Sequence, residues 1–126
     1  MSVKYNVVPK KNPGDPAATP KYYPSVVKSG SITLRQLAKR ISAISTVSTI
    51  DTLAVLEGLL TVVPEELTAG QVVHLGEFGS FWLRIKTTGA ELPGQVTAHN
   101  ILDTRVRFTP GKEFKQALAT IDFEKN

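Results

Sequence analysis

Two stretches in the second half of the chain alternate apolar with polar or basic side chains. Because successive side chains of a strand point to opposite faces, each stretch is predicted to be a strand with one apolar and one basic face. The basic positions are Arg84 and Lys86 in the first stretch and Arg105 and Arg107 in the second. If the two strands pair in one antiparallel sheet, the four cations share a surface. A phosphate backbone would relieve their mutual repulsion and release counterions, so the pattern favours DNA binding.

Each of these features also has a plainer interpretation. The four cations can belong to an ordinary solvated sheet face, with Glu91 and Asp103 as neutralising neighbours. The start of the last predicted helix, with Lys112, is a second candidate phosphate contact. Capping of that helix by Thr109 explains the same residues without a ligand.

The residue types in the sequence do not indicate a catalytic site. The chain has two histidines and no cysteine, and no nucleophile, metal-ligand or phosphate-loop motif occurs. We therefore expect a protein that is not an enzyme, with no cofactor, no metal and no small-molecule substrate.

The length and charge of the chain set broad limits. Its 126 residues suit one domain, and no apolar run is long enough to cross a membrane. The net charge is +4, and residues 1–30 carry all of it, with five lysines and one aspartate. The first residues contain no apolar signal core, so we expect a cytoplasmic protein without a membrane partner.

Prolines and apolar periodicity divide the first half of the chain. Residues 2–8 and 22–28 are predicted strands that flank a proline-rich loop, and Pro24 confines the second to a sheet edge or a bulge. A first helix is expected from Thr33, and a second from Ser48 to a break or kink at Pro64. The second helix is apolar around much of its circumference, which predicts burial between two subunits.

The basic strands are positioned by turns and breakers. Gly76 and Gly79 predict a tight corner between two strands over 72–86. A polar, breaker-rich excursion follows, and 96–100 is expected to return as strand. The last helix is expected to begin with Thr109 as N-cap and Pro110 at its first position.

Three motifs resemble the bacterial HU/integration host factor family of histone-like DNA-binding proteins. Residues 72–81 (VVHLGEFGSF) are similar to its strand–G-F-G-T-F segment, and residues 108–115 (FTPGKEFK) to its F-x-P-G-K-x-[LF]-K signature. Residues 33–37 (TLRQL) resemble the opening of its first helix. The similarity spans about residues 32–121, and the N-terminal addition resembles that of HU-like proteins of the Bacteroidetes type.

The resemblance implies an intertwined homodimer whose two-stranded arms enter the minor groove of double-stranded DNA. It assigns Arg84, Lys86, Arg105 and Arg107 to the arm bases and saddle, and Lys112 to a turn that faces phosphate. The family's arm tip carries R-N-P amid arginines. Here residues 89–95 (GAELPGQ) contain no arginine or asparagine, and Pro93 is the only proline in position to act as a wedge.

We therefore predict an α+β fold with two N-terminal helices, an antiparallel sheet with a protruding arm and a short C-terminal helix. Residues 1–30 are expected to form a β-arm extension and residues 31–126 an HU-like domain. The predicted function is sequence-tolerant DNA binding and DNA organisation in the bacterial nucleoid. The alternative is a structural or protein-interaction dimer in which DNA binding is weak or lost.

Overall fold

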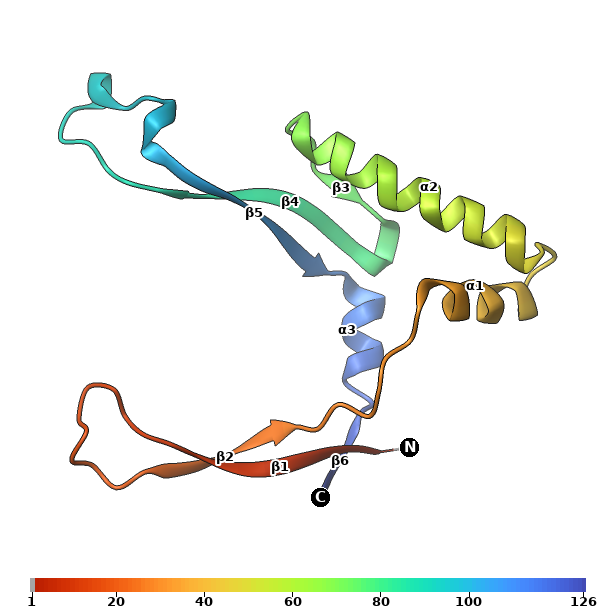
Figure 1. The fold of residues 1–126 in the computed structure, drawn as a ribbon, viewed down its shortest axis with the longest axis horizontal. Coiled ribbons are helices and arrows are strands. Elements are labelled where there is room, and N and C mark those ends of the chain that lie inside the picture. Colours follow the sequence, from red (N-terminus) through yellow and green to blue (C-terminus); the bar gives the residue numbers. More distant parts are fainter. Residues whose placement is uncertain (1) are drawn as a thin grey trace. The chain divides into compact units, whose positions relative to one another are not determined.

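The computed structural model describes residues 2–126, which fall into two compact units. One unit comprises the chain up to Thr33 together with Ala117–Asn126, and the other comprises Leu34–Gln116 (Figure 1). The predicted α+β class is confirmed, with three α-helices and two sheets among the described residues. The predicted domain division at residue 30 stays a prediction.

The first unit is built on a three-stranded sheet. Strands β1 (Ser2–Lys10) and β2 (Lys21–Val26) form an antiparallel hairpin, and β6 (Asp122–Lys125) pairs with β1 in parallel. Strand β2 lies at the sheet edge, as Pro24 requires. The sequence patterns did not indicate β6, because four residues of mixed polarity carry no clear period.

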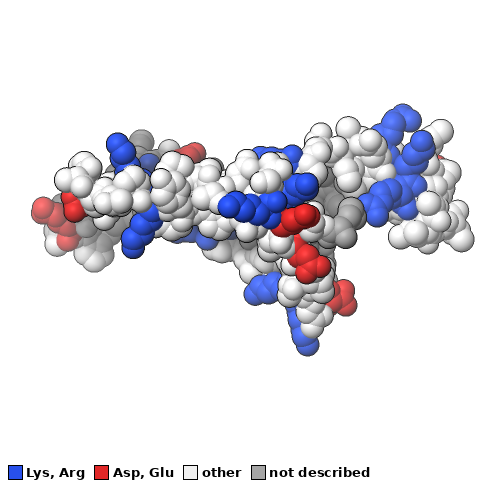
Figure 2. Space-filling view, turned by 90° about the horizontal axis from the view of Figure 1, so that it is seen from below, with Lys and Arg blue, Asp and Glu red and all other residues white. Residues whose placement is uncertain are grey.

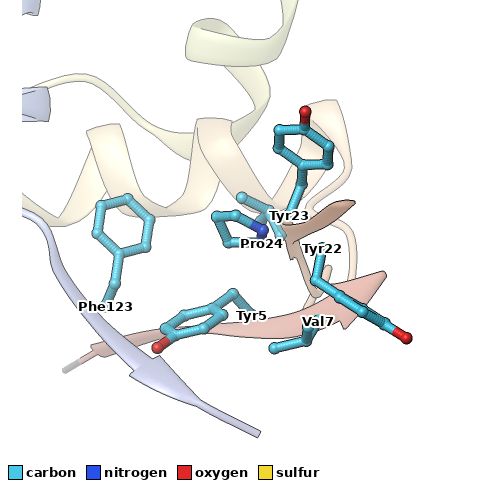
Figure 3. Close-up of a pocket in the computed structure, with 7 residues that line it drawn as sticks. Tyr5, Val7, Tyr22, Tyr23, Pro24 and Phe123 are labelled. Carbon is cyan, nitrogen blue, oxygen red and sulfur yellow. The ribbon is translucent and has the colours of Figure 1, made fainter. Parts of the chain in front are cut away.

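One face of this sheet is apolar and forms a shallow hollow (Figure 3). In the strand register its residues share one side of β1, β2 and β6. Tyr23 borders the hollow as well, although it follows Tyr22 and the two rings point in different directions. The lining residues on the shared side are Tyr5, Val7, Tyr22, Pro24, Val26 and Phe123.

The second unit begins with two contacting helices, α1 (Leu34–Ala43) and α2 (Thr49–Thr68). Ser48 caps α2 as predicted, because its side chain accepts a hydrogen bond of 3.1 Å from the backbone N–H of Asp51. Of the two predicted effects of Pro64, a break in the helix is wrong, since α2 continues to Thr68, and a kink stays a prediction. The lost backbone donor is tolerated because the final turn buries Leu67, which is 6% exposed.

A glycine corner joins the short strand β3 (Val73–His74) to the long strand β4 (Gly79–Thr87). The 3₁₀ turn η1 (Gly76–Phe78) makes the corner, with φ of +57° at Gly76 and +150° at Gly79. These values suit glycine, and a Cβ on Gly79 would lie 2.6 Å from the Phe108 ring. The predicted corner is therefore confirmed, and it also permits close packing.

Strand β5 (Ile101–Pro110) pairs with β4, and the two extend as a long ribbon (Figure 1). The predicted strand over 96–100 is wrong. That region contains the 3₁₀ turn η3 (Ala98–Asn100), which follows a similar turn η2 (Pro93–Gln95). Thr97 caps η3 through reciprocal hydrogen bonds with the Asn100 side chain and the local backbone, and this local bonding replaces a strand ladder.

Helix α3 (Lys112–Leu118) begins two residues later than predicted. Thr109 and Pro110 belong to β5, and the Gly111 carbonyl accepts the first helical hydrogen bond, from the Lys115 N–H at 3.0 Å. The helix start is held against the corner by a cluster of phenylalanine rings with centroids 4.8–5.6 Å apart. The cluster comprises Phe78, Phe81, Phe108 and Phe114.

Much of the apolar surface of the second unit remains exposed in the single chain. Ile50, Val55 and Leu60 of α2 are 77%, 69% and 55% exposed, and Val106 of β5 is 58% exposed. The predicted apolar stripe of α1 is also open, whereas Ala38 is fully buried. In the described part of the chain no helix is long and apolar enough to span a membrane.

Candidate nucleic-acid interface

The register of the β4–β5 ribbon brings the four predicted cations onto one face. Arg84 lies directly opposite Arg105, Arg107 lies opposite Trp82, and Lys86 lies opposite Asp103. Directly opposed residues of antiparallel strands point to the same side, so these side chains share a surface. We call the surface formed by Arg84, Lys86, Arg105 and Arg107 the basic face.

The basic face is exposed and lines a shallow hollow of about 500 Å³. All four cations line it, together with Ile85 and Val106. On the face of the molecule shown in Figure 2, lysine and arginine side chains project from the surface at several places.

One acidic residue partly neutralises this face. The Asp103 Oδ2 atom lies 3.3 Å from the Arg105 Nε atom, and both side chains are more than half exposed. A pair so open to solvent contributes little to stability and is screened by salt. Among residues 2–126 no other ion pair is found on this face, so Arg84 and Arg107 are not neutralised by a carboxylate.

Trp82 fixes the base of the ribbon. Its indole Nε1 donates a hydrogen bond of 3.2 Å to the Thr109 hydroxyl, and the side chain is half-buried. This bond gives the Thr109 hydroxyl a role between the strands in place of the predicted helix cap. The ring is thereby held beside Arg107, its register partner.

Lys112 and Pro93 are not among the residues that line the basic face. Lys112 is exposed at the start of α3, which has seven residues. The glycine before it has a packing role, because the Gly111 N–H donates to the Phe78 carbonyl at 2.9 Å and a Cβ on Gly111 would collide with the Glu77 carbonyl. The turn formed by Pro110, Gly111 and Lys112 therefore packs the start of α3 against the glycine corner.

Pro93 lies at the tip of the ribbon, where the strand ladder has ended. The tip closes through a hydrogen bond of 2.8 Å from the Thr88 N–H to the Asn100 carbonyl. Leu92 and Val96 flank η2 and are each 59% exposed, so the tip presents apolar side chains. Glu91 is the only acidic residue over 88–100, and no lysine or arginine occurs there.

The described residues offer no metal site. Across residues 2–126 no three histidine or acidic side chains gather closely enough to hold a metal ion. The His74 Nδ1 atom lies 2.7 Å from the Ser80 hydroxyl across β3 and β4, which gives this histidine a structural partner.

The fold is similar to two solved structures. A Bacteroides vulgatus protein, provisionally described as a bacterial DNA-binding protein, shares 17% identity and a TM-score of 0.70 over 98% of this chain. This chain spans about half (47%) of that protein's length. The Anabaena HU–DNA cocrystal structure shares 23% identity and a TM-score of 0.56, covering 71% of this chain and 99% of the Anabaena chain.

No curated protein matches the sequence. A family model, described as "HU-HIG: HU domain fused to wHTH, Ig, or Glycine-rich motif", matches residues 1–125. This match includes the N-terminal hairpin as well as the helices, the ribbon and α3. The chain therefore belongs to the HU-HIG family.

Proposed function

We propose that the chain binds double-stranded DNA through the basic face and organises it with little sequence preference. The observation that carries this proposal is the register that sets Arg84 directly against Arg105, with Arg107 and Lys86 on the same exposed side. Such an arrangement of like charges costs stability in the free protein, and a phosphate backbone relieves it. Membership of the HU-HIG family and the fold shared with an HU–DNA cocrystal structure support the same function.

The basic face suits phosphates better than base edges. Its guanidinium and ammonium groups lie on the paired strands β4 and β5, and among residues 2–126 no α-helical residue lines the hollow beside them to read a major groove. Binding should therefore depend on backbone charge and groove shape, with weak dependence on sequence. DNA binding of this kind would place the chain in the cytoplasm, at the bacterial nucleoid.

We also propose that the functional unit is an intertwined homodimer. Val55 and Leu60 of α2 and Val106 of the ribbon are each more than half exposed, and all lie in the second unit. Covering such surfaces with a second copy removes apolar area from water, at about 25 cal/mol per Å². A dimer would also present two basic faces to one DNA duplex.

The ribbon tips would then reach around the duplex. Leu92 and Pro93 are the exposed apolar groups at each tip, and an apolar wedge of this kind can unstack a base step and bend DNA. Lys112 is proposed to contact phosphate near the base of the ribbon as a point charge. These roles for the tip and for Lys112 rest on the family resemblance and on exposure.

A structural or protein-interaction dimer is the competing function. The composition of the tip favours it, because residues 88–100 contain Glu91 and no lysine or arginine that could follow a minor groove. Asp103 also withdraws part of the charge of Arg105. Under this alternative the apolar surfaces would still form a dimer, and duplex DNA would bind weakly or not at all.

A salt-dependent titration separates the two functions. We expect a fluorescent duplex to bind the protein with an affinity that falls about 10³-fold between 50 and 200 mM salt, as for six or more phosphate contacts. A triple variant (Arg84→Gln, Arg105→Gln, Arg107→Gln) should bind weakly on every sequence and give a smaller salt slope.

The control removes the same charge from α1, through Arg35→Gln, Lys39→Gln and Arg40→Gln, which lie in the same unit but off the ribbon. A parent protein that does not bind duplex DNA at low salt would refute the proposed function. Equal losses of affinity in the two triple variants would refute the role of the basic face.

A further inference from the structure

A second basic hollow lies at the loop end of the β1–β2 hairpin, in the first unit. Its volume is about 450 Å³. Lys10 and Lys11 reach it from the end of β1, Lys21 from the start of β2, and Asn12 and Tyr23 also line it. We call this site the hairpin hollow.

The strand register forces two of these lysines together. Lys10 lies directly opposite Lys21 in the antiparallel hairpin, and like charges in such a cross-strand pair are destabilising. The Lys10 ammonium lies 5.6 Å from the centroid of the Tyr23 ring, a cation–π contact that holds it over the sheet. The hairpin therefore maintains a concentrated positive charge at its loop end.

No acidic side chain lines the hairpin hollow within the described part of the chain. Asp15, the acidic residue of the loop, uses its Oδ1 atom to accept a hydrogen bond of 3.2 Å from the Ala17 N–H. Among residues 2–126 no ion pair to Lys10, Lys11 or Lys21 is found. The hollow therefore brings three lysines together with no carboxylate among its lining residues.

The loop that bounds the hollow is ordered by its own hydrogen bonds. The Asn12 side chain accepts from the Gly14 N–H at 3.0 Å, and the Asn12 carbonyl accepts from the Asp15 N–H at 3.1 Å. Pro13, Pro16 and Pro20 restrict the backbone further. An anion that binds here therefore meets a loop whose backbone is already ordered, so little backbone entropy is lost on binding.

We propose that the hairpin hollow is a second contact for the phosphate backbone of duplex DNA, additional to the basic face. This inference rests on the proposed function. Three flexible ammonium groups without a carboxylate suit phosphate oxygens. A single strand would need aromatic faces on which bases stack, and the one aromatic ring of the hollow, Tyr23, already faces Lys10. The hollow therefore fits the charged backbone of a duplex.

The test compares two triple variants of the full chain by the salt-dependent titration described above. The hollow variant carries Lys10→Gln, Lys11→Gln and Lys21→Gln. The control variant carries Lys4→Gln, Lys28→Gln and Lys125→Gln, which remove the same charge from the same unit outside the hollow. We expect the salt slope of the hollow variant to fall by about 0.9 for each phosphate that is no longer neutralised, so by up to about 2.7 for each subunit that contacts the duplex, and that of the control to stay unchanged.

A third variant with arginine at all three hollow positions keeps the charge and should bind as the parent does. The loss of the Lys10–Lys21 repulsion should offset the loss of the Lys10–Tyr23 cation–π contact, so the melting temperature of the hollow variant should stay close to that of the parent. This measurement separates a binding defect from a folding defect. The same titrations on a single strand of identical sequence show which form of DNA the hollow contacts.

The inference is overturned if the hollow variant binds duplex like the parent while the basic-face variant is weakened, a result that leaves the proposed function intact. Equal losses of affinity in the hollow and control variants, or a loss confined to single-stranded DNA, also overturn it. A parent that does not bind duplex at all refutes the proposed function, and this inference with it.

Discussion

Replacement of Asp103 by asparagine should strengthen DNA binding. Asparagine has the same shape and keeps the Oδ1 acceptor, which receives a hydrogen bond of 2.9 Å from the Thr104 N–H. The change removes one negative charge from the basic face, opposite Lys86 and beside Arg105. The fold should lose little stability, because a pair this exposed contributes at most about 1 kcal/mol.

The gain in affinity follows from Coulomb's law. A phosphate paired with Arg105 would lie roughly 6–7 Å from the Asp103 carboxylate, given the 3.3 Å separation of that pair. Repulsion at this distance is about 0.6 kcal/mol in water, which is roughly threefold in affinity for each subunit. A homodimer that uses both basic faces should therefore bind roughly tenfold more tightly at low salt, with a smaller gain as salt screens the charge.

Fluorescence anisotropy with a plain duplex at 50 mM salt measures this change. The matched control is Glu57→Gln, which removes one exposed carboxylate from α2 and should alter affinity far less. If Asp103→Asn binds DNA no more tightly than the parent, while its unfolding curve matches the parent's, phosphates do not approach Arg105 and the basic face is wrongly assigned.

Three other substitutions test the dimer, the corner and the tip. Val55→Asp places a charge on an exposed apolar position of α2 and should convert the dimer to monomer in sedimentation, whereas an unchanged dimer would exclude this face from the interface. Gly111→Ala should lower the free energy of unfolding in urea by about 1–3 kcal/mol or more, because its Cβ meets the Glu77 carbonyl; equal stability would contradict that packing. Pro93→Ala should reduce DNA bending measured by energy transfer between duplex ends, and an unchanged angle would rule out a wedge at Pro93.

Local patterns in the sequence determined the elements and their faces. Alternation predicted β4 and β5 and which side of each is basic, and the two glycines predicted the corner, because these signals depend on neighbouring residues alone. The Ser48 cap and the edge position of Pro24 were predictable for the same reason. Local patterns did not predict two features. At the ribbon tip, local hydrogen bonds formed 3₁₀ turns in place of a strand. In α2, burial of the final turn let the helix continue past Pro64.

The tertiary structure decided which distant residues meet. Arg84 faces Arg105, and Lys10 faces Lys21, only because of strand register, which depends on long-range pairing and not on local period. The pairing of β6 with β1 and the locking of Gly111 against the corner likewise require the assembled chain. The sequence thus determined that basic strands exist, whereas the register determined where their charges concentrate.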